Sequence, residues 1–181
     1  MKKLFCLLLS LTLLLTLCSC GATEEAIDDE EVIAEDGTIT DEEIVALIDG
    51  DIQIGKYLSV EPPSYDWENS IDGKYDWFPV VKEGLETWDE WEAYIYSIYS
   101  GEKAEYALSH ESFADIDGKL YCTGFAGAYV LTDDYVYEVL ENADGTAKVK
   151  ITNPDVWGES AREYTLVMTL TDDGWRVSGQ E

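Results

Sequence analysis

The chain has 181 residues, of which 39 are acidic and 11 basic, so its formal net charge at pH 7 is −28. Such a charge excludes nucleic-acid binding, which needs a positive surface, and it favours basic proteins or divalent cations as charged partners. With one histidine and four cysteines, the sequence offers few groups for nucleophilic catalysis.

The first residues have the layout of a secretory signal. Two lysines precede an uncharged, leucine-rich run from Leu4 to Leu17, and a charged segment followed by an apolar one is typical of export signals. The run is too short to cross a bilayer core of ~30 Å as a stable helix. We therefore expect the chain to be exported and the signal to be removed.

The end of the apolar run indicates how the chain is held after export. Leu17 lies three residues before Cys20, and the small Ser19 lies directly before it. This arrangement resembles the lipobox of bacterial lipoproteins. The resemblance implies a signal peptide over residues 1–19, diacylglyceryl modification of Cys20, and an anchor on the extracytoplasmic face of the cell membrane, which two or more acyl chains make stable. A signal that is cleaved without lipidation is the alternative.

An acidic tether is expected over residues 20–39. Runs such as Asp28–Glu31 carry few large apolar side chains, and a stretch of this kind cannot bury enough surface to offset its loss of entropy on ordering. Repulsion from anionic headgroups should hold the following domain away from the membrane.

Folding signals begin at Thr40 and predict a single domain over residues 40–181. Thr40 with Glu43 forms a capping box, and the apolar spacing after it predicts a helix over about 41–54, broken near Gly50.

A second helical region follows. Thr87 with Glu90 forms another capping box, ahead of an apolar stripe from Trp88 to Tyr99 that spans three helical turns. A short helix over 104–108, capped by Ser100, is expected next.

The rest of the domain is predicted to be strands. A short strand is expected near residues 77–81. Three Asp-Gly pairs, at 117–118, 144–145 and 173–174, lie between alternating apolar residues and predict tight hairpins. The fold class is therefore α+β, with N-terminal helices packed on a C-terminal curved antiparallel sheet of hairpins.

Residues with catalytic or metal-binding chemistry are sparse. Cys122 has no partner for an internal disulfide and reads as a small residue packed in a strand, while His110 lies in a polar loop that we expect to be exposed. Residues 115–118 carry part of an EF-hand loop, but Ala126 stands where its last acidic ligand belongs. Because no nucleotide, zinc or redox motif is present either, we expect no enzyme activity, no cofactor and no specific metal.

The aromatic content is high, with six Trp and twelve Tyr. Those of the 88–99 stripe are expected in the core, whereas Trp67, Trp77 and Trp157 lie near turns. These three either pack at the ends of the sheet, or stay exposed to stack on sugar rings or to anchor a protein partner.

Five segments carry a resemblance to a known family. They are residues 77–81, the capped helix that begins at Thr87, and residues 98–104, 113–121 and 173–177. In order and spacing they resemble the DL-endopeptidase inhibitor (IseA-like) family of Firmicutes cell-envelope lipoproteins. The closing hairpin is also similar to the cystatin-like and NTF2-like arrangement of helix and curved sheet.

The resemblance implies a monomeric Gram-positive surface lipoprotein that docks on an NlpC-type cysteine peptidase and blocks its cleavage of cell-wall peptides. It supplies no catalytic residues. The contact residues we expect are loop positions on the acidic surface: Asp133, Asp134, Asp155, Trp157 and Glu159. The alternative is an NTF2-like, non-catalytic module that binds a ligand or glycan at the cell surface.

Overall fold

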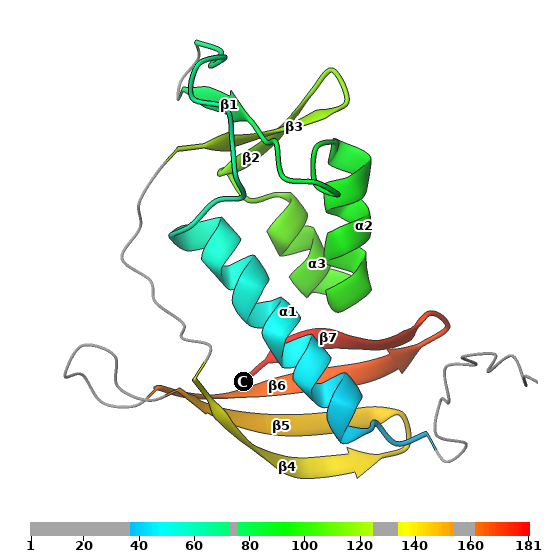
Figure 1. Ribbon diagram of the computed structural model, residues 1–181. Helices are drawn as coiled ribbons and strands as arrows, with labels where there is room; N and C mark the ends of the chain where they lie inside the picture. The colour runs from blue at the N-terminus through cyan, green and yellow to red at the C-terminus, as the bar shows by residue number, and fades with distance from the viewer. Residues whose placement is uncertain (1–36, 73–75, 125–133, 154–161) are drawn as a thin grey trace, which may run out of the picture. The chain divides into compact units, whose positions relative to one another are not determined.

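The computed structural model describes residues 37–72, 76–124, 134–153 and 162–181, which belong to one structural unit. Within them, three helices and seven strands follow one another along the chain (Figure 1). The helices are α1 (Asp41–Ser59), α2 (Trp88–Ile98) and α3 (Gly101–Leu108). The strands are β1 (Trp77–Pro79), β2 (Phe113–Ile116), β3 (Lys119–Thr123), β4 (Val136–Ala143), β5 (Thr146–Asn153), β6 (Arg162–Thr171) and β7 (Gly174–Gln180).

The strands form two antiparallel sheets, so the predicted α+β class is confirmed while the expected single sheet is not. One sheet has the order β1-β3-β2 and the other β4-β5-β6-β7. The β2–β3 hairpin does not join the later hairpins because β1 pairs with β3, with Phe78 opposite Cys122. Since β1 precedes α2, the helices also do not all come before the strands.

Both capping boxes are confirmed. The backbone N–H groups of Thr40 and Thr87 donate to the carboxylates of Glu43 and Glu90, at 2.8 and 2.9 Å. The prediction that α1 ends near residue 54 is wrong, because the helix continues unbroken through Gly50 to Ser59. Tyr57, beyond the predicted end, is also buried and continues the apolar pattern of the helix.

The start of α3 differs in one detail from the prediction. Ser100 is the N-cap residue, but its side chain makes no capping hydrogen bond. Its backbone N–H instead donates to the carbonyl oxygen of Val177 at 3.1 Å. The α2–α3 connection is thereby fixed to β7 rather than closed on itself.

Two of the Asp-Gly hairpins are confirmed. Asp117 and Gly118 both have positive φ, at 55° and 79°, as do Asp144 and Gly145, at 53° and 73°. Two consecutive left-handed residues match the right-handed twist of the flanking strands. The third turn lies one residue earlier than predicted, because Gly174, with φ 99°, is already the first residue of β7.

The core lies between the helices and the four-stranded sheet. Alternate residues of β5 are buried on this face, including Ala147, Val149 and Ile151, each fully covered. The helices are also hydrogen-bonded to β7, since the guanidinium of Arg176 donates to the carbonyl of Tyr96 at 2.7 Å. The three-stranded sheet lies at the other end of the helices (Figure 1), where Trp91 stacks on Phe113 with ring centroids 4.5 Å apart.

The segment before α1 is already part of the fold. The side-chain amide of Asn142 on β4 donates to the carbonyl of Ile39 and accepts from its N–H, both at 2.9 Å. Ile39 is buried. Ordered contacts therefore begin ahead of Thr40.

Candidate functional site

Three aromatic rings gather at the edge of the three-stranded sheet. Tyr65, Trp67 and Phe78 have ring centroids 4.8 Å (Tyr65 to Trp67), 5.2 Å (Tyr65 to Phe78) and 5.9 Å (Trp67 to Phe78) apart. The rings are tilted by 44° to 61° to one another, which is the offset and edge-to-face geometry that aromatic pairs favour. We call these three residues the aromatic cluster.

The aromatic cluster is formed by a segment that runs beside β1. Tyr65 pairs with Val80 and Ile71 pairs with Trp77 in isolated antiparallel bridges, so residues 66–70 project from the sheet edge. Gly124 allows the rings to lie close to the backbone. A Cβ at this position would come within 2.9 Å of the Phe78 ring and 3.2 Å of the Tyr65 hydroxyl.

Trp67 is the outermost member of the aromatic cluster and is 71% exposed. By contrast, Trp91 and Trp175 are buried in the core, and Trp77 is half-buried. An exposed tryptophan held in place by two other rings presents a large, rigid apolar surface, which is what an interface anchor requires. Of the three tryptophans singled out from the sequence, Trp157 lies outside the described residues. Of the other two, Trp67 is the exposed one.

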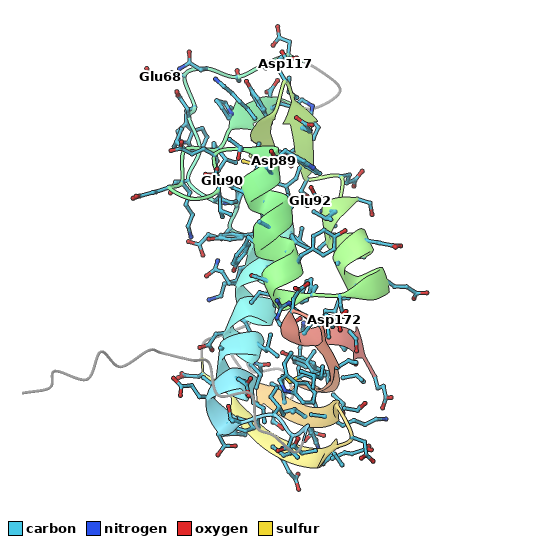
Figure 2. All side chains as sticks on the ribbon, turned by 90° about the vertical axis from the view of Figure 1, so that its right-hand side faces the viewer. Glu68, Asp89, Glu90, Glu92, Asp117 and Asp172 are labelled. Carbon is cyan, nitrogen blue, oxygen red and sulfur yellow. The ribbon has the colours of Figure 1, made fainter. Side chains whose placement is uncertain are left out.

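Carboxylates surround this end of the molecule. Figure 2 shows Glu68 and Asp117 at the end formed by the three-stranded sheet, with Asp89 and Glu90 at the adjoining start of α2. All four residues are exposed. An aromatic anchor at an acidic end of the molecule suits a protein-binding surface that selects basic partners.

A groove of about 470 Å³ lies next to the aromatic cluster. Asp66, which separates Tyr65 from Trp67 in the sequence, lines it together with Asn69. Two residues of β3, Lys119 and Tyr121, line it as well. Further lining comes from Pro79, Val80, Val81, Glu86 and Thr87. The groove therefore combines apolar surface with groups of both charges.

Asp66 is held in a fixed orientation. One carboxylate oxygen accepts from the backbone N–H of Glu68 at 2.9 Å and the other from the side-chain amide of Asn69 at 2.6 Å. These hydrogen bonds, that of Asn69 first, lower the pKa of Asp66, because they favour the charged form. Asp66 is thus a carboxylate near neutral pH.

Of the five partner-binding residues predicted from the sequence, the described part of the chain includes one, Asp134. Asp133, Asp155, Trp157 and Glu159 lie outside the described residues. Asp134 is exposed, but it precedes β4 in the four-stranded sheet, whereas the aromatic cluster lies on the three-stranded sheet.

The described residues hold no reactive thiol. Cys122 is fully buried in β3, as predicted for a small packed residue. Burial raises its pKa to about 12, so the nucleophilic thiolate is scarce at neutral pH. His110 is more covered than expected: it is half-buried, its ring lies edge-on to that of Tyr106, and its Nδ1 accepts from the N–H of Ser112.

The partial EF-hand motif at residues 115–118 covers the end of β2 and the β2–β3 turn. Asp115 accepts there from the N–H of Gly118 at 2.8 Å. No group of three or more metal-ligating side chains is found among the described residues.

A buried charge cluster escaped the sequence analysis. Asp51 on α1 is 6% exposed; its carboxylate lies 2.6 Å from the ammonium of Lys103 on α3 and accepts from the hydroxyl of Tyr99 at 2.8 Å. The Lys103 ammonium also lies 4.8 Å from the centre of the Tyr99 ring. Only the helical phase of Asp51, on the same side as Ile44, Leu47 and Ile48, could have indicated that it points inward.

The sequence matches no protein-family model, and no curated protein matches it. The IseA-like resemblance therefore stays a prediction. Among the described residues, no helix combines the length and apolarity needed to cross a membrane.

Proposed function

We propose that this chain is a non-catalytic surface lipoprotein, anchored through Cys20 on the extracytoplasmic face of the membrane, that binds and inhibits a cell-wall endopeptidase of the NlpC type. The observation that carries the binding proposal is Trp67, exposed by 71% while packed on two other rings. The resemblance supplies the peptidase as partner.

Two properties of the surface support a protein partner. A few aromatic anchors contribute most of the binding energy at protein interfaces, and Trp67 offers such an anchor. The carboxylates around it would raise the association rate of a basic partner and reject acidic ones. Binding should therefore weaken as salt increases, because the Debye length falls to a few ångströms at ~0.5 M.

Purified residues 21–181 should inhibit wall lysis by an NlpC-type endopeptidase. Trp67→Ala should raise the inhibition constant by about 30-fold or more, since a hot-spot residue is worth at least ~2 kcal/mol. Tyr106→Ala is the matched control, because Tyr106 is 64% exposed but lies on α3, outside the aromatic cluster. Lysis that proceeds unchanged with every such endopeptidase of the source organism would refute the inhibitor proposal.

The alternative is a glycan-binding module, and the aromatic cluster beside a groove favours it specifically. Sugar rings stack on exposed aromatic faces while nearby polar groups bind their hydroxyls. In that case wall or dietary glycan fragments, and not the peptidase, should change the tryptophan fluorescence of the wild type, and Trp67→Ala should abolish the change. Flat titrations would count against this alternative.

A further inference from the structure

The groove beside the aromatic cluster contains an ammonium group that has no partner among the described residues. Lys119 lines the groove, and no hydrogen bond or ion pair of its side chain is found within residues 37–72, 76–124, 134–153 and 162–181. This is unusual in a chain with 39 acidic and 11 basic residues. Other lysines are paired: Lys103 with Asp51 at 2.6 Å and Lys148 with Glu181 at 2.8 Å.

The local structure explains why Lys119 has no partner within the described segments. It follows the β2–β3 turn, where the nearby carboxylate of Asp115 is already bound to the N–H of Gly118. Its backbone pairs with Thr87 at the start of α2, which places its side chain at the groove. The ammonium is therefore available to a ligand.

The groove also offers two carboxylates and a hydroxyl to a ligand. The carboxylate of Glu86 has no side-chain partner in the described part of the chain, and the hydroxyl of Tyr121 makes no hydrogen bond there. Asp66 adds a second carboxylate, fixed by its bonds to Glu68 and Asn69. The lining thus presents two negative charges and one positive charge.

Charge considerations select the ligand. A simple anion would be repelled by a protein of net charge −28, and a simple cation would offer no hydrogen-bond acceptor to the Lys119 ammonium. A molecule with both charges can satisfy both sides. The residues Pro79, Val80 and Val81 provide apolar surface for a small side chain, and the volume of about 470 Å³ lies within the ~300–1,000 Å³ that is usual for small-molecule sites.

We propose that this groove binds a small zwitterion, an amino acid or the free ends of a short peptide. The ligand carboxylate lies on Lys119 and the Tyr121 hydroxyl, and its ammonium group lies on Glu86 and Asp66. This site goes beyond the proposed endopeptidase binding, because it uses none of the residues of the aromatic cluster.

The test uses the full-length chain, labelled with ¹⁵N, in a nonionic detergent. The probes are alanine and the dipeptide alanyl-alanine, the latter free, acetylated at its N-terminus, amidated at its C-terminus, or blocked at both ends. Backbone amide shifts of Asn69, Lys119 and Tyr121 report binding at the groove. Alanyl-alanine should bind with a dissociation constant of about 1 mM, and blocking either end should weaken it about tenfold.

Comparing alanine with alanyl-alanine separates the two sources of this chemistry. Tighter binding of the dipeptide assigns the groove to peptide ends, and equal binding assigns it to free amino acids; either result supports the proposal. Lys119→Met and Glu86→Gln should each weaken the preferred probe about tenfold. Lys150→Met is the matched control, because it also removes one positive charge but from an exposed ion pair with Glu163 on the other sheet.

The proposal is overturned if the doubly blocked dipeptide binds as well as the free one, or if Lys119→Met and Lys150→Met behave alike. It is also overturned if no groove amide shifts with alanine or alanyl-alanine up to about 20 mM. Because Trp67 has no part in this test, a failure here leaves the endopeptidase proposal standing, and loss of inhibition in Trp67→Ala leaves the zwitterion site standing.

Discussion

Replacing Lys103 by Met should destabilise the protein severely, although the substitution keeps most of the side-chain volume. Lys103 is the cation that neutralises Asp51, whose carboxylate lies 2.6 Å away. The two side chains are 16% and 8% exposed. Without the ammonium, the Asp51 charge would stay in the space between the helices, with the hydroxyl of Tyr99 as its remaining side-chain partner within the described residues.

The magnitude follows from the geometry. At 2.6 Å and an effective dielectric constant of ~20, the gross attraction is about 6 kcal/mol. Desolvation of the two charges opposes several kcal/mol of this, so the pair contributes little net stability relative to an apolar pair of the same shape. Removing one partner alone is different, because it leaves the desolvation cost uncompensated. We expect Lys103→Met to lower the free energy of unfolding by about 3 kcal/mol, toward the lower end of what such deletions cost, because Lys103 is near the surface.

A double-mutant cycle measures the coupling. Urea unfolding of residues 21–181 would be followed by circular dichroism for the wild type, Lys103→Met, Asp51→Leu and the double variant. The double variant should lie within about 1 kcal/mol of the wild type, so that the coupling energy is at least ~2 kcal/mol. If Lys103→Met unfolds at the wild-type midpoint, or the double variant is as unstable as both single variants combined, the reasoning is refuted.

Three further changes test other parts of the fold by the same unfolding measurement. Thr87→Ala removes a capping box and should cost about 1 kcal/mol; a wild-type midpoint would contradict the cap. Gly50→Ala gains about 1 kcal/mol of helix propensity but places a Cβ 2.5 to 3.1 Å from three atoms of Ile98, which should cost more than the gain; an increase in stability would contradict the close contact of α1 and α2. Stability should fall as the pH rises from 9 toward 12, because the pKa of Cys122 is raised from 9.0 to about 12 by burial, so the folded state retains a proton that the unfolded state releases. The stability of Cys122→Ala should fall less steeply between pH 8 and 10. An unchanged slope would exclude the Cys122 thiol as the source of the pH dependence.

The sequence predicted the elements whose signals are local. The capping boxes at Thr40 and Thr87 satisfy orphan N–H groups within one helical turn, so their outcome depends on little else. The turns at 117–118 and 144–145 are equally local, since Asp-Gly suits two left-handed residues in succession. Each of these predictions could be made from about four adjacent residues.

Predictions that depended on distant contacts were wrong or could not be made. The break in α1 was predicted near Gly50 because glycine has a low helix propensity, but the helix continues there and the glycine lets Ile98 on α2 lie close to its backbone. The division into two sheets depends on which strand pairs with β3, and alternation in the sequence does not determine a strand's partner. The Asp51 and Lys103 pair joins residues on two helices, so no spacing rule could have found it.

The candidate site was predicted only in part, for the same reason. Trp67 was singled out as a tryptophan near a turn, but its exposure depends on Tyr65 and Phe78 supporting it from one side, which needs the bridge to β1. The acidic residues expected to bind a partner were chosen by charge alone. In a chain with 39 acidic residues, charge does not distinguish one surface from another, whereas an exposed aromatic ring does.

Stability and the proposed binding depend on different parts of this molecule, and this makes the role of Trp67 measurable. Full burial of a large apolar side chain is worth about 1.5–3 kcal/mol, and Trp67 is 71% exposed, so its contacts with Tyr65 and Phe78 contribute only a fraction of that. We expect Trp67→Ala to lower the free energy of unfolding by about 1 kcal/mol at most. The residue belongs neither to the Asp51 cluster nor to the buried face of α1. Loss of binding in this variant, with its urea midpoint nearly unchanged, would then report on recognition rather than on folding. A loss of several kcal/mol would instead mean that Trp67 serves chiefly to hold the edge of the three-stranded sheet.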